Sequence, residues 1–250
     1  MTTILRIATR VLSLVRPCLA QHDIRYYYYI NCIHCEPNPA GGVIAVATDG
    51  HRLAAALDPD GQCAAPIDIQ LPADAWRQCD SAGGVSPTWR GTRNAGSRDL
   101  VVSVDPSKAP TDDFGQLITG PMLRGYEIEI QFARAPHTRH WVAPVARDVI
   151  VDGEYPDWRR VLPKTVDEWN QLGPCQASLN PHYLSAIAKH VSKDSGTSVR
   201  LWQRQKTEGN PANDSVLVQF GSVPGLVLVI MPRTDGETDK WPMPGFMRAP

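Results

Sequence analysis

Two short stretches place polar side chains where apolar residues would otherwise continue. VATDGHRLA (46–54) puts His51 and Arg52 directly after Asp-Gly, a dipeptide typical of two-residue hairpin turns, and between two apolar runs. GEYPDWRRVLP (153–163) holds two aromatic residues, two prolines and two adjacent arginines within eleven residues. Imidazole and guanidinium groups fixed by a strand's backbone can orient carbonyl or carboxylate groups of a bound molecule. These stretches are therefore the first candidates for a binding site.

Cys32 and Cys35 have the spacing of half a zinc site. They fall in a predicted strand, where residues three apart point to opposite faces, and no second pair follows. Buried thiols are the favoured interpretation, zinc binding is the alternative, and no metal ligand is assigned. The six cysteines are scattered and no export signal accompanies them, which predicts reduced thiols in a cytoplasmic protein.

No stretch of the sequence carries a full catalytic motif. Glycine-rich phosphate loops and the Gly-x-Ser-x-Gly elbow are absent, and Asp113-Phe114-Gly115 lacks the motifs that accompany it in kinases. His137 and His140 lack the helix and the glutamate of a metalloprotease site. We therefore expect a protein that is not an enzyme and needs no cofactor.

The composition is that of an ordinary globular protein. The 250 residues are 42% hydrophobic and 20% charged, with a formal net charge of −1. A nucleic-acid contact would therefore have to come from local positive patches. No apolar run reaches the length of a membrane span, and arginines interrupt any secretory signal near the amino end; a mitochondrial presequence is the alternative for this start.

The segment 3–15 is predicted to form an amphipathic helix. Its apolar residues follow the 3, 4, 7 spacing of one buried stripe, and the opposite face carries arginines and no carboxylate. A solvated face is the simpler interpretation of this charge, but surface helices usually mix both signs, so the face is also a candidate for function. Its arginines are Arg6, Arg10 and Arg16.

A later helix is predicted to begin after Asn180, a favourable N-cap, with Pro181 at its first position. It too leaves basic residues, Lys189 and Lys193, outside its apolar stripe. Aromatic and β-branched runs bounded by turn residues predict strands after both helices. These strands are expected at 25–36, 43–48 and 51–57, and at 199–203, 215–220 and 226–231.

A more degenerate unit lies between them. It comprises a strand at 67–71, a helix at 73–79, a loop-rich tract at 80–121, and strands at 100–104, 126–133 and 141–151. The repeated order of one helix followed by several strands predicts an α+β fold built from loosely repeated units with antiparallel strands.

Several motifs resemble one protein family. VATDGHRLA resembles, residue for residue, the middle-domain motif of the bacterial DNA polymerase III beta subunit, the sliding clamp. Residues 153–163 resemble the segment that joins that family's second and third domains, and VLVIMP (227–232) is similar to its terminal Val-Val-Met-Pro. Two further stretches, HDIRYYYY (22–29) and LNPHYLSAIAKHV (179–191), also resemble segments of this family. All five stretches occur along the chain in the family's order. The short, divergent form suggests a phage-encoded member.

The resemblance implies DNA-clamp-like repeats of unequal completeness. Residues 1–163 would form a clamp-like domain that matches the family's middle domain, with a long loop at 80–121. Residues 164–234 would form a partial domain that matches the second half of the family's last domain, and 235–250 would be a tail. The family's first domain has no counterpart. A closed ring needs six clamp-type domains, so a trimer would close if each chain holds two of them, whereas one and a half domains per chain argue against a ring.

The resemblance also implies a pocket for a linear peptide motif with apolar anchors. Three segments distant in sequence would form its walls: Thr48, Gly50, His51, Arg52 and Leu53; Pro156, Arg160 and Val161; Val229, Met231 and Pro232, with Tyr28 as a further wall residue. The structural alternative is that these residues only fold a hairpin and a domain junction.

In the family, positive helices face the DNA backbone. The resemblance therefore implies that Arg6, Arg10, Arg16, Lys189 and Lys193 contact double-stranded DNA without reading bases. The implied partners are a DNA polymerase or other proteins with a clamp-binding motif, and a clamp loader, in the cytoplasm of a bacterial or phage-infected cell. Two functions remain open: a processivity clamp, or a clamp-like adaptor or decoy that binds such peptides without encircling DNA.

Overall fold

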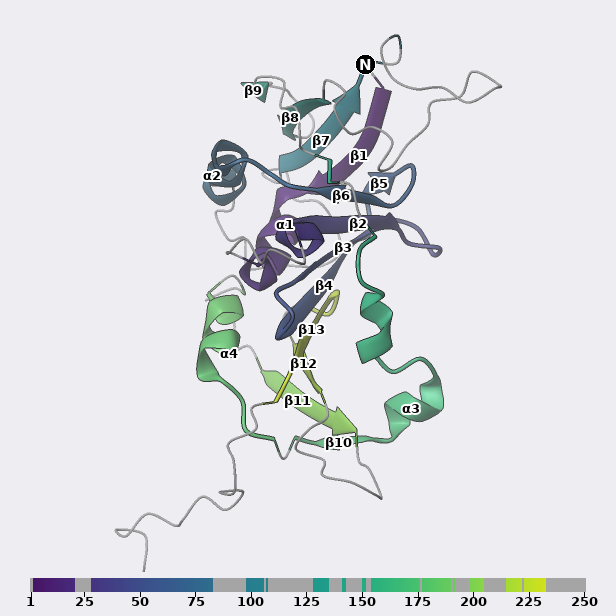
Figure 1. Ribbon diagram of the computed structural model, residues 1–250, viewed down its shortest axis with the longest axis vertical. Coiled ribbons are helices and arrows are strands. Elements are labelled where there is room, and N and C mark those ends of the chain that lie inside the picture. The colour runs from purple at the N-terminus through teal and green to yellow at the C-terminus, as the bar shows by residue number, and fades with distance from the viewer. Residues whose placement is uncertain are drawn as a thin grey trace, which may run out of the picture.

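The structure is a computed structural model that describes residues 2–20, 28–82, 98–105, 107, 128–134, 141–142, 150–151, 154–175, 177–189, 191, 198–204, 215–221 and 223–232. These residues form two antiparallel sheets, one of five strands and one of eight (Figure 1). No helix among them has the length and hydropathy needed to cross a membrane. The α+β class and the antiparallel strands predicted from the sequence are confirmed.

The five-stranded sheet has the order β5-β1-β7-β8-β9. Its strands are β5 (Gln62–Cys63), β1 (Thr2–Ala8), β7 (Arg98–Val104), β8 (Ile128–Arg134) and β9 (Trp141–Val142).

The eight-stranded sheet has the order β10-β11-β12-β13-β4-β3-β2-β6. Its strands are β10 (Leu172–Pro174), β11 (Val199–Arg204), β12 (Val216–Phe220), β13 (Leu226–Ile230), β4 (Arg52–Asp58), β3 (Val43–Thr48), β2 (Ile33–Pro37) and β6 (Ile67–Ile69).

Four α-helices and three 3-10 turns accompany the sheets within the described residues. The helices are α1 (Thr9–Val15), α2 (Ala73–Ala82), α3 (Val166–Asn170) and α4 (Pro181–Ala188), and the turns are η1 (Arg16–Cys18), η2 (Tyr28–Asn31) and η4 (Trp158–Val161). Helix α1 packs against α2 and against β3 and β4. In Figure 1, α4 and α3 lie on opposite sides of the lower strands.

The eight-stranded sheet joins the two halves of the chain. Strand β13 pairs antiparallel with β4, from Leu226 opposite Ala56 to Ile230 opposite Arg52. A strand from near residue 230 therefore continues the sheet of the hairpin formed by β3 and β4 (Figure 1).

Strands β3 and β4 are covered on both faces. Alternate residues of β4 point to opposite sides, so Ala54 and Ala56 belong to one apolar cluster, and Leu53 and Ala55 to another. Helix α1 contributes to the first cluster, and residues 154–163, here called the connector, contribute to the second. Burial on both faces explains why β4 is a nearly continuous apolar run.

The first predicted helix is partly wrong. Residues 3–8 belong to strand β1, which pairs with β7 from Thr2 opposite Val104 to Ala8 opposite Asp99, and the helix α1 covers only Thr9–Val15. Ile4, Leu5, Ile7 and Ala8 are all buried, so this segment has no exposed helical face. A short, consecutive apolar run is compatible with the periodicity of either a helix or a strand, and the pairing with β7 makes this segment a strand.

The strand predicted at 25–36 is also only partly correct. Its described portion begins with the 3-10 turn η2, and strand β2 starts at Ile33. Helix α3 and strand β10, between the connector and α4, were not predicted. The amino-terminal end of α4 is as predicted, because the Asn180 side chain accepts a hydrogen bond from the His182 N–H at 3.0 Å. Most of 80–121 and all of 235–250 lie outside the described residues.

Candidate functional site

The turn between β3 and β4 is held by its own side chains. Thr48 Oγ1 donates to the Arg52 carbonyl at 2.8 Å and accepts from the Gly50 N–H at 3.2 Å. Asp49 Oδ1 accepts from the N–H groups of His51 at 3.0 Å and Arg52 at 2.9 Å. Gly50 has φ +84°, a conformation that side chains rarely adopt. The turn is therefore rigid, and its central residues are Gly50 and His51, one position later than predicted.

Strand β13 and the residue after it fix this turn from the other side. The Met231 N–H donates to the His51 carbonyl at 2.8 Å, and Val229 pairs with Leu53 across the sheet. Sheet pairing alone therefore brings two of the three distant segments together.

Arg52 is held in place from two directions. Its Nε lies 2.8 Å from Asp49 Oδ2, and its guanidinium lies 4.9 Å from the centre of the Tyr183 ring on α4. Its side chain is only 13% exposed. A cation over an aromatic face is favourable, so this residue connects the hairpin to α4.

The connector supplies the third segment. Trp158 in η4 is 8% exposed and packs in the same apolar cluster as Leu53 and Val229. The guanidinium of Arg159 lies 4.2 Å from the centre of the Trp158 ring and makes a bidentate contact with the Glu36 carboxylate on β2. The connector is thus attached to the sheet by both apolar packing and charge.

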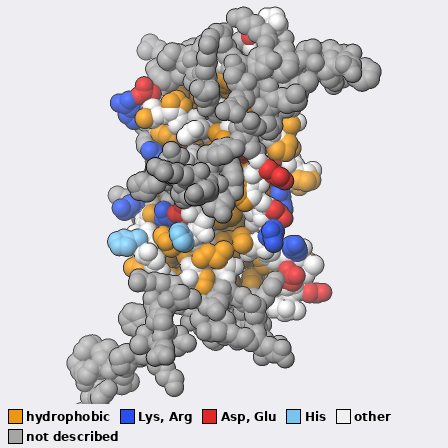
Figure 2. Space-filling view, in the orientation of Figure 1, with side chains coloured by type: hydrophobic (Ala, Val, Ile, Leu, Met, Phe, Trp, Pro, Cys, Tyr) orange, Lys and Arg blue, Asp and Glu red, His pale blue; other side chains and the backbone are white. Residues whose placement is uncertain are grey.

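These three segments enclose a cavity of about 340 Å³. This volume is within the range of small-ligand pockets, and it is suited to a few apolar side chains. Figure 2 shows hydrophobic side chains gathered in the middle of one face, with histidine on one side and basic side chains on the other. The cavity is lined by Ile30, Thr48, Gly50, His51, Arg52, Leu53, Pro156, Asp157, Trp158, Val161, Val229 and Met231.

The structure brings together most of the residues that the sequence analysis assigned to a pocket. Arg160 and Pro232 are not among the lining residues, and the side chain of Tyr28 lies outside the described part. Ile30, Asp157 and Trp158 also line the cavity and were not predicted. Asp157 and Trp158 directly follow Pro156, which was assigned to the pocket, so their place in the sequence could have identified them. Binding of a peptide at this cavity stays a prediction.

The basic residues assigned to DNA do not share one helical face. Arg6 lies on strand β1, which corrects the helical assignment, and its Nε is 2.9 Å from Asp99 Oδ2. Arg10 on α1 is half-buried, and burial lowers the pKa of its guanidinium. The guanidinium of Arg16 lies 4.6 Å from the centre of the Trp76 ring. Lys189, at the end of α4, is exposed, and Lys193 lies outside the described residues.

The thiols of Cys32 and Cys35 are fully buried. Burial raises the pKa of both groups, which disfavours the thiolate that a metal would need. Within the described residues, no group of three or more histidine, cysteine or acidic side chains is placed to hold a metal ion.

The chain is similar to known sliding clamps. No model of a protein family matches it. It is 26% identical over 211 residues to the beta sliding clamp of Salmonella typhimurium; the match covers 82% of this chain and 45% of that protein, so the chain spans about half the length of this relative.

Solved structures show the same fold. The DNA polymerase sliding clamp from Pseudomonas aeruginosa is 17% identical, with a TM-score of 0.52 over 93% of this chain and 67% of that one. The DNA polymerase III beta subunit from Thermotoga maritima is 14% identical, with a TM-score of 0.54 over 94% and 67%. The fold is therefore that of a sliding clamp, and the chain is a divergent protein resembling the DNA polymerase III beta subunit.

Proposed function

From this sliding-clamp fold and the similarity to a beta sliding clamp, we propose that the chain is a clamp-like processivity factor without catalytic activity of its own. It would tether a DNA polymerase, or another protein with a clamp-binding motif, through a peptide in the 340 Å³ cavity. It would touch the DNA backbone without reading bases, and a clamp loader would assist it in the cytoplasm of its host.

The observation that carries this proposal is the composition of the cavity. Leu53, Val161 and Val229 offer apolar walls, and Met231, 37% exposed, offers a flexible one. His51 and Arg52 add fixed polar groups beside them. Apolar walls with a few oriented polar groups suit a short peptide with apolar anchors.

An adaptor or decoy that binds the same peptides without encircling DNA is the second candidate. The observation that favours it is the placement of the basic residues. Arg6 is paired with Asp99, Arg10 is half-buried and Arg16 stacks over Trp76. Each of these arginines is thus already engaged or partly buried within the chain, which favours a protein whose binding of peptides does not depend on DNA.

Peptide binding tests the proposal directly. A fluorescein-labelled peptide with two leucines and a terminal phenylalanine would be titrated with the protein and followed by fluorescence anisotropy. Val161→Asp is expected to weaken binding by at least about tenfold, because it places a carboxylate in an apolar wall. Val199→Asp is the matched control, since Val199 is 47% exposed on β11 and does not line the cavity. Equal affinity of the two variants would contradict the proposal.

Retention on DNA separates the two candidates. A processivity clamp is expected to stay on closed circular DNA and to slide off the same DNA after linearisation. An adaptor is expected to show no difference between the two forms while it still binds the peptide.

A further inference from the structure

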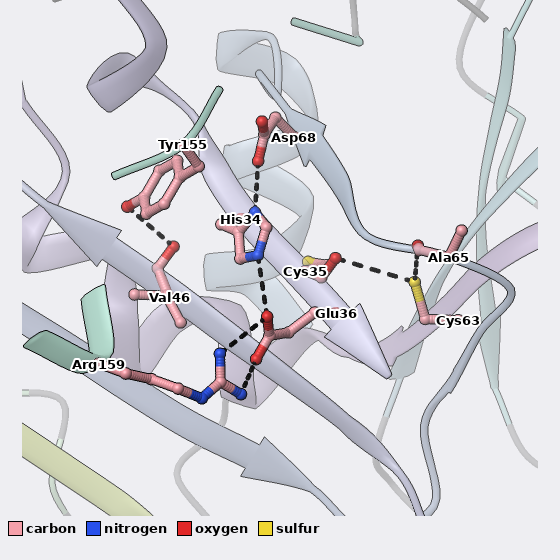
Figure 3. A network of polar contacts seen from close by, with 9 residues as sticks. All are labelled: His34, Cys35, Glu36, Val46, Cys63, Ala65, Asp68, Tyr155 and Arg159. Carbon is pink, nitrogen blue, oxygen red and sulfur yellow. Dashed lines mark hydrogen bonds and ion pairs between the residues drawn. The ribbon is translucent and has the colours of Figure 1, made fainter. Parts of the chain in front are cut away.

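A histidine on β2 lies between two carboxylates (Figure 3). His34 Nδ1 is 2.7 Å from Asp68 Oδ1 on β6, and His34 Nε2 is 3.2 Å from Glu36 Oε2. The positions follow from the sheet: Asp68 is the cross-strand partner of His34, and Glu36 is two residues further along the same face. His34, Glu36 and Asp68 are here called the clasp.

The clasp is satisfied only when the imidazole is charged. A neutral imidazole donates from one nitrogen and presents a lone pair at the other, whereas an imidazolium donates from both. With a carboxylate at each nitrogen, the neutral form would turn a lone pair towards a negative oxygen. The side chains of His34 and Glu36 are each only 13% exposed, so water replaces these contacts poorly.

The clasp reaches the wall of the cavity by two routes. Glu36 also makes the bidentate contact with Arg159, which stacks on the cavity residue Trp158. The His34 ring stacks on the Tyr155 ring, with centres 4.8 Å apart and planes 18° apart. The residue after Tyr155, Pro156, also lines the cavity. The connector is therefore attached to the clasp at two points, Tyr155 and Arg159, which flank the cavity residues Pro156 to Trp158.

We infer that the clasp positions the connector wall of the cavity, so that peptide affinity depends on the charge of His34. This inference rests on the proposed peptide-binding function. His34, Glu36 and Asp68 act as positioning residues, because none of them lines the cavity. The expected ligand is the same apolar peptide, which should bind with lower affinity when the clasp no longer fixes the connector.

The surroundings of His34 define the pH range. Burial lowers the pKa of His34, but the contacts with Asp68 and Glu36 raise it more, so it is raised overall from 6.5. Burial raises the pKa of Glu36, whereas Arg159 and His34 lower it further, so it is lowered from 4.5. Val46, the partner of His34 on β3, carries no charge, and Tyr155 is neutral because burial raises its pKa.

The direction of each pKa shift determines the pH range in which that group stabilises the clasp. The raised histidine contributes fully below pH 6.5, and its contribution is lost as the pH rises through the folded-state pKa. The lowered glutamate contributes above pH 4.5, and its contribution is lost as the pH falls through its own folded-state pKa. The clasp is therefore strongest between pH 4.5 and 6.5 and loosens on the alkaline side.

The first experiment measures the connector without any peptide. Hydrogen–deuterium exchange followed by mass spectrometry would give protection factors for residues 154–163, corrected for intrinsic exchange, between about pH 6 and pH 8.5. Protection is expected to fall by about threefold to tenfold over this range in the wild type. In His34→Gln it should be low and independent of pH. The matched control is His182→Gln, because His182 is exposed on α4, and this variant should behave as the wild type.

The second experiment repeats the titration with the labelled peptide across the same pH range. Affinity is expected to weaken by about threefold to tenfold as the pH rises, and this dependence should disappear in His34→Gln. Glu36→Gln provides a second variant within the clasp. Its control is Asp74→Asn, because Asp74 forms an exposed ion pair with Arg77.

The exchange experiment tests the positioning of the connector by the clasp, and the titration tests peptide binding and its dependence on the clasp. A pH dependence of protection that persists unchanged in His34→Gln would overturn the clasp. The same holds for protection that does not change with pH in the wild type. If the connector responds as expected but no variant binds the peptide at any pH, the positioning of the connector stands. The peptide-binding function and the link to affinity would then be rejected.

Discussion

At the scale of single residues, the side chains around the cavity are fixed by short polar contacts. Asp49 uses one oxygen for two backbone N–H groups and the other for the Arg52 side chain. Thr48 both donates to and accepts from the same turn. Groups held in this way need no ordering when a ligand binds, which lowers the entropic cost of association.

Removal of the Asp49 carboxylate tests this arrangement. Asp49→Ala is expected to weaken peptide binding on the order of fivefold, because Arg52 loses a charged partner and the turn loses two hydrogen bonds from backbone N–H groups. Fluorescence anisotropy would measure the change. Asp74→Ala removes the carboxylate of an exposed ion pair with Arg77 and should leave peptide affinity unaltered. If both substitutions had the same effect, the turn would not position the site.

Two adjacent glycines allow a sharper test of backbone geometry. Gly41 and Gly42 have φ of +101° and +86°, but a Cβ at Gly42 would lie 2.3 Å from the Asp58 carbonyl oxygen, whereas nothing lies within 4 Å at Gly41. Gly41→Ala is expected to lower the free energy of unfolding by about 1 kcal/mol, and Gly42→Ala by more than about 2 kcal/mol. Urea titration of both variants checks the difference. Equal losses would show that strain in φ, and not contact with Asp58, sets the cost.

At the scale of elements, the site depends on packing between segments that are far apart in the chain. Strand β13 extends the β3–β4 hairpin, and the connector covers the face of β4 that α1 leaves open. Helix α4 reaches the same hairpin through Tyr183 and Arg52. The cavity therefore forms only when both halves of the chain are folded together.

The contact between α4 and the hairpin leads to a prediction with an internal control. Tyr183→Leu removes the aromatic face beneath the Arg52 guanidinium and is expected to weaken peptide binding by about twofold to fivefold. Tyr183→Phe retains the ring and should bind as the wild type. Anisotropy titration of the pair checks the prediction, and a loss in Tyr183→Phe would assign the effect to the hydroxyl instead.

At the scale of the whole molecule, the described residues contain one sheet that combines strands from residues 33–69 with strands from residues 172–230, and a second sheet whose strands all lie within residues 2–142. The chain matches 45% of the length of a beta sliding clamp. If it works as a ring, a trimer is the proposed form.

Mass in solution tests the ring. Light scattering at low and moderate salt is expected to show a species near three times 27.5 kDa. A strict monomer at working concentrations would exclude a self-assembled ring and favour the adaptor. Peptide binding would be unaffected by this result, because the cavity lies within one chain.

The sequence by itself determined the features that local chemistry controls. The Asp-Gly turn followed by His51 and Arg52, the N-cap at Asn180 and the strands 43–48 and 199–203 depend on neighbouring residues, and the structure contains each of them within one or two positions. The family resemblance of residues 46–54 was readable for the same reason, since a continuous motif keeps its order in the chain.

The tertiary structure decided what depends on distant partners. Residues 3–8 are a strand because β7 pairs with them, and Arg6 meets Asp99 across 93 positions of sequence. The clasp could not be read from the chain, because His34 acquires its meaning only when β6 brings Asp68 opposite it. Hydrophobic periodicity specifies which face of a segment is buried, but long-range pairing selects the partner that buries it.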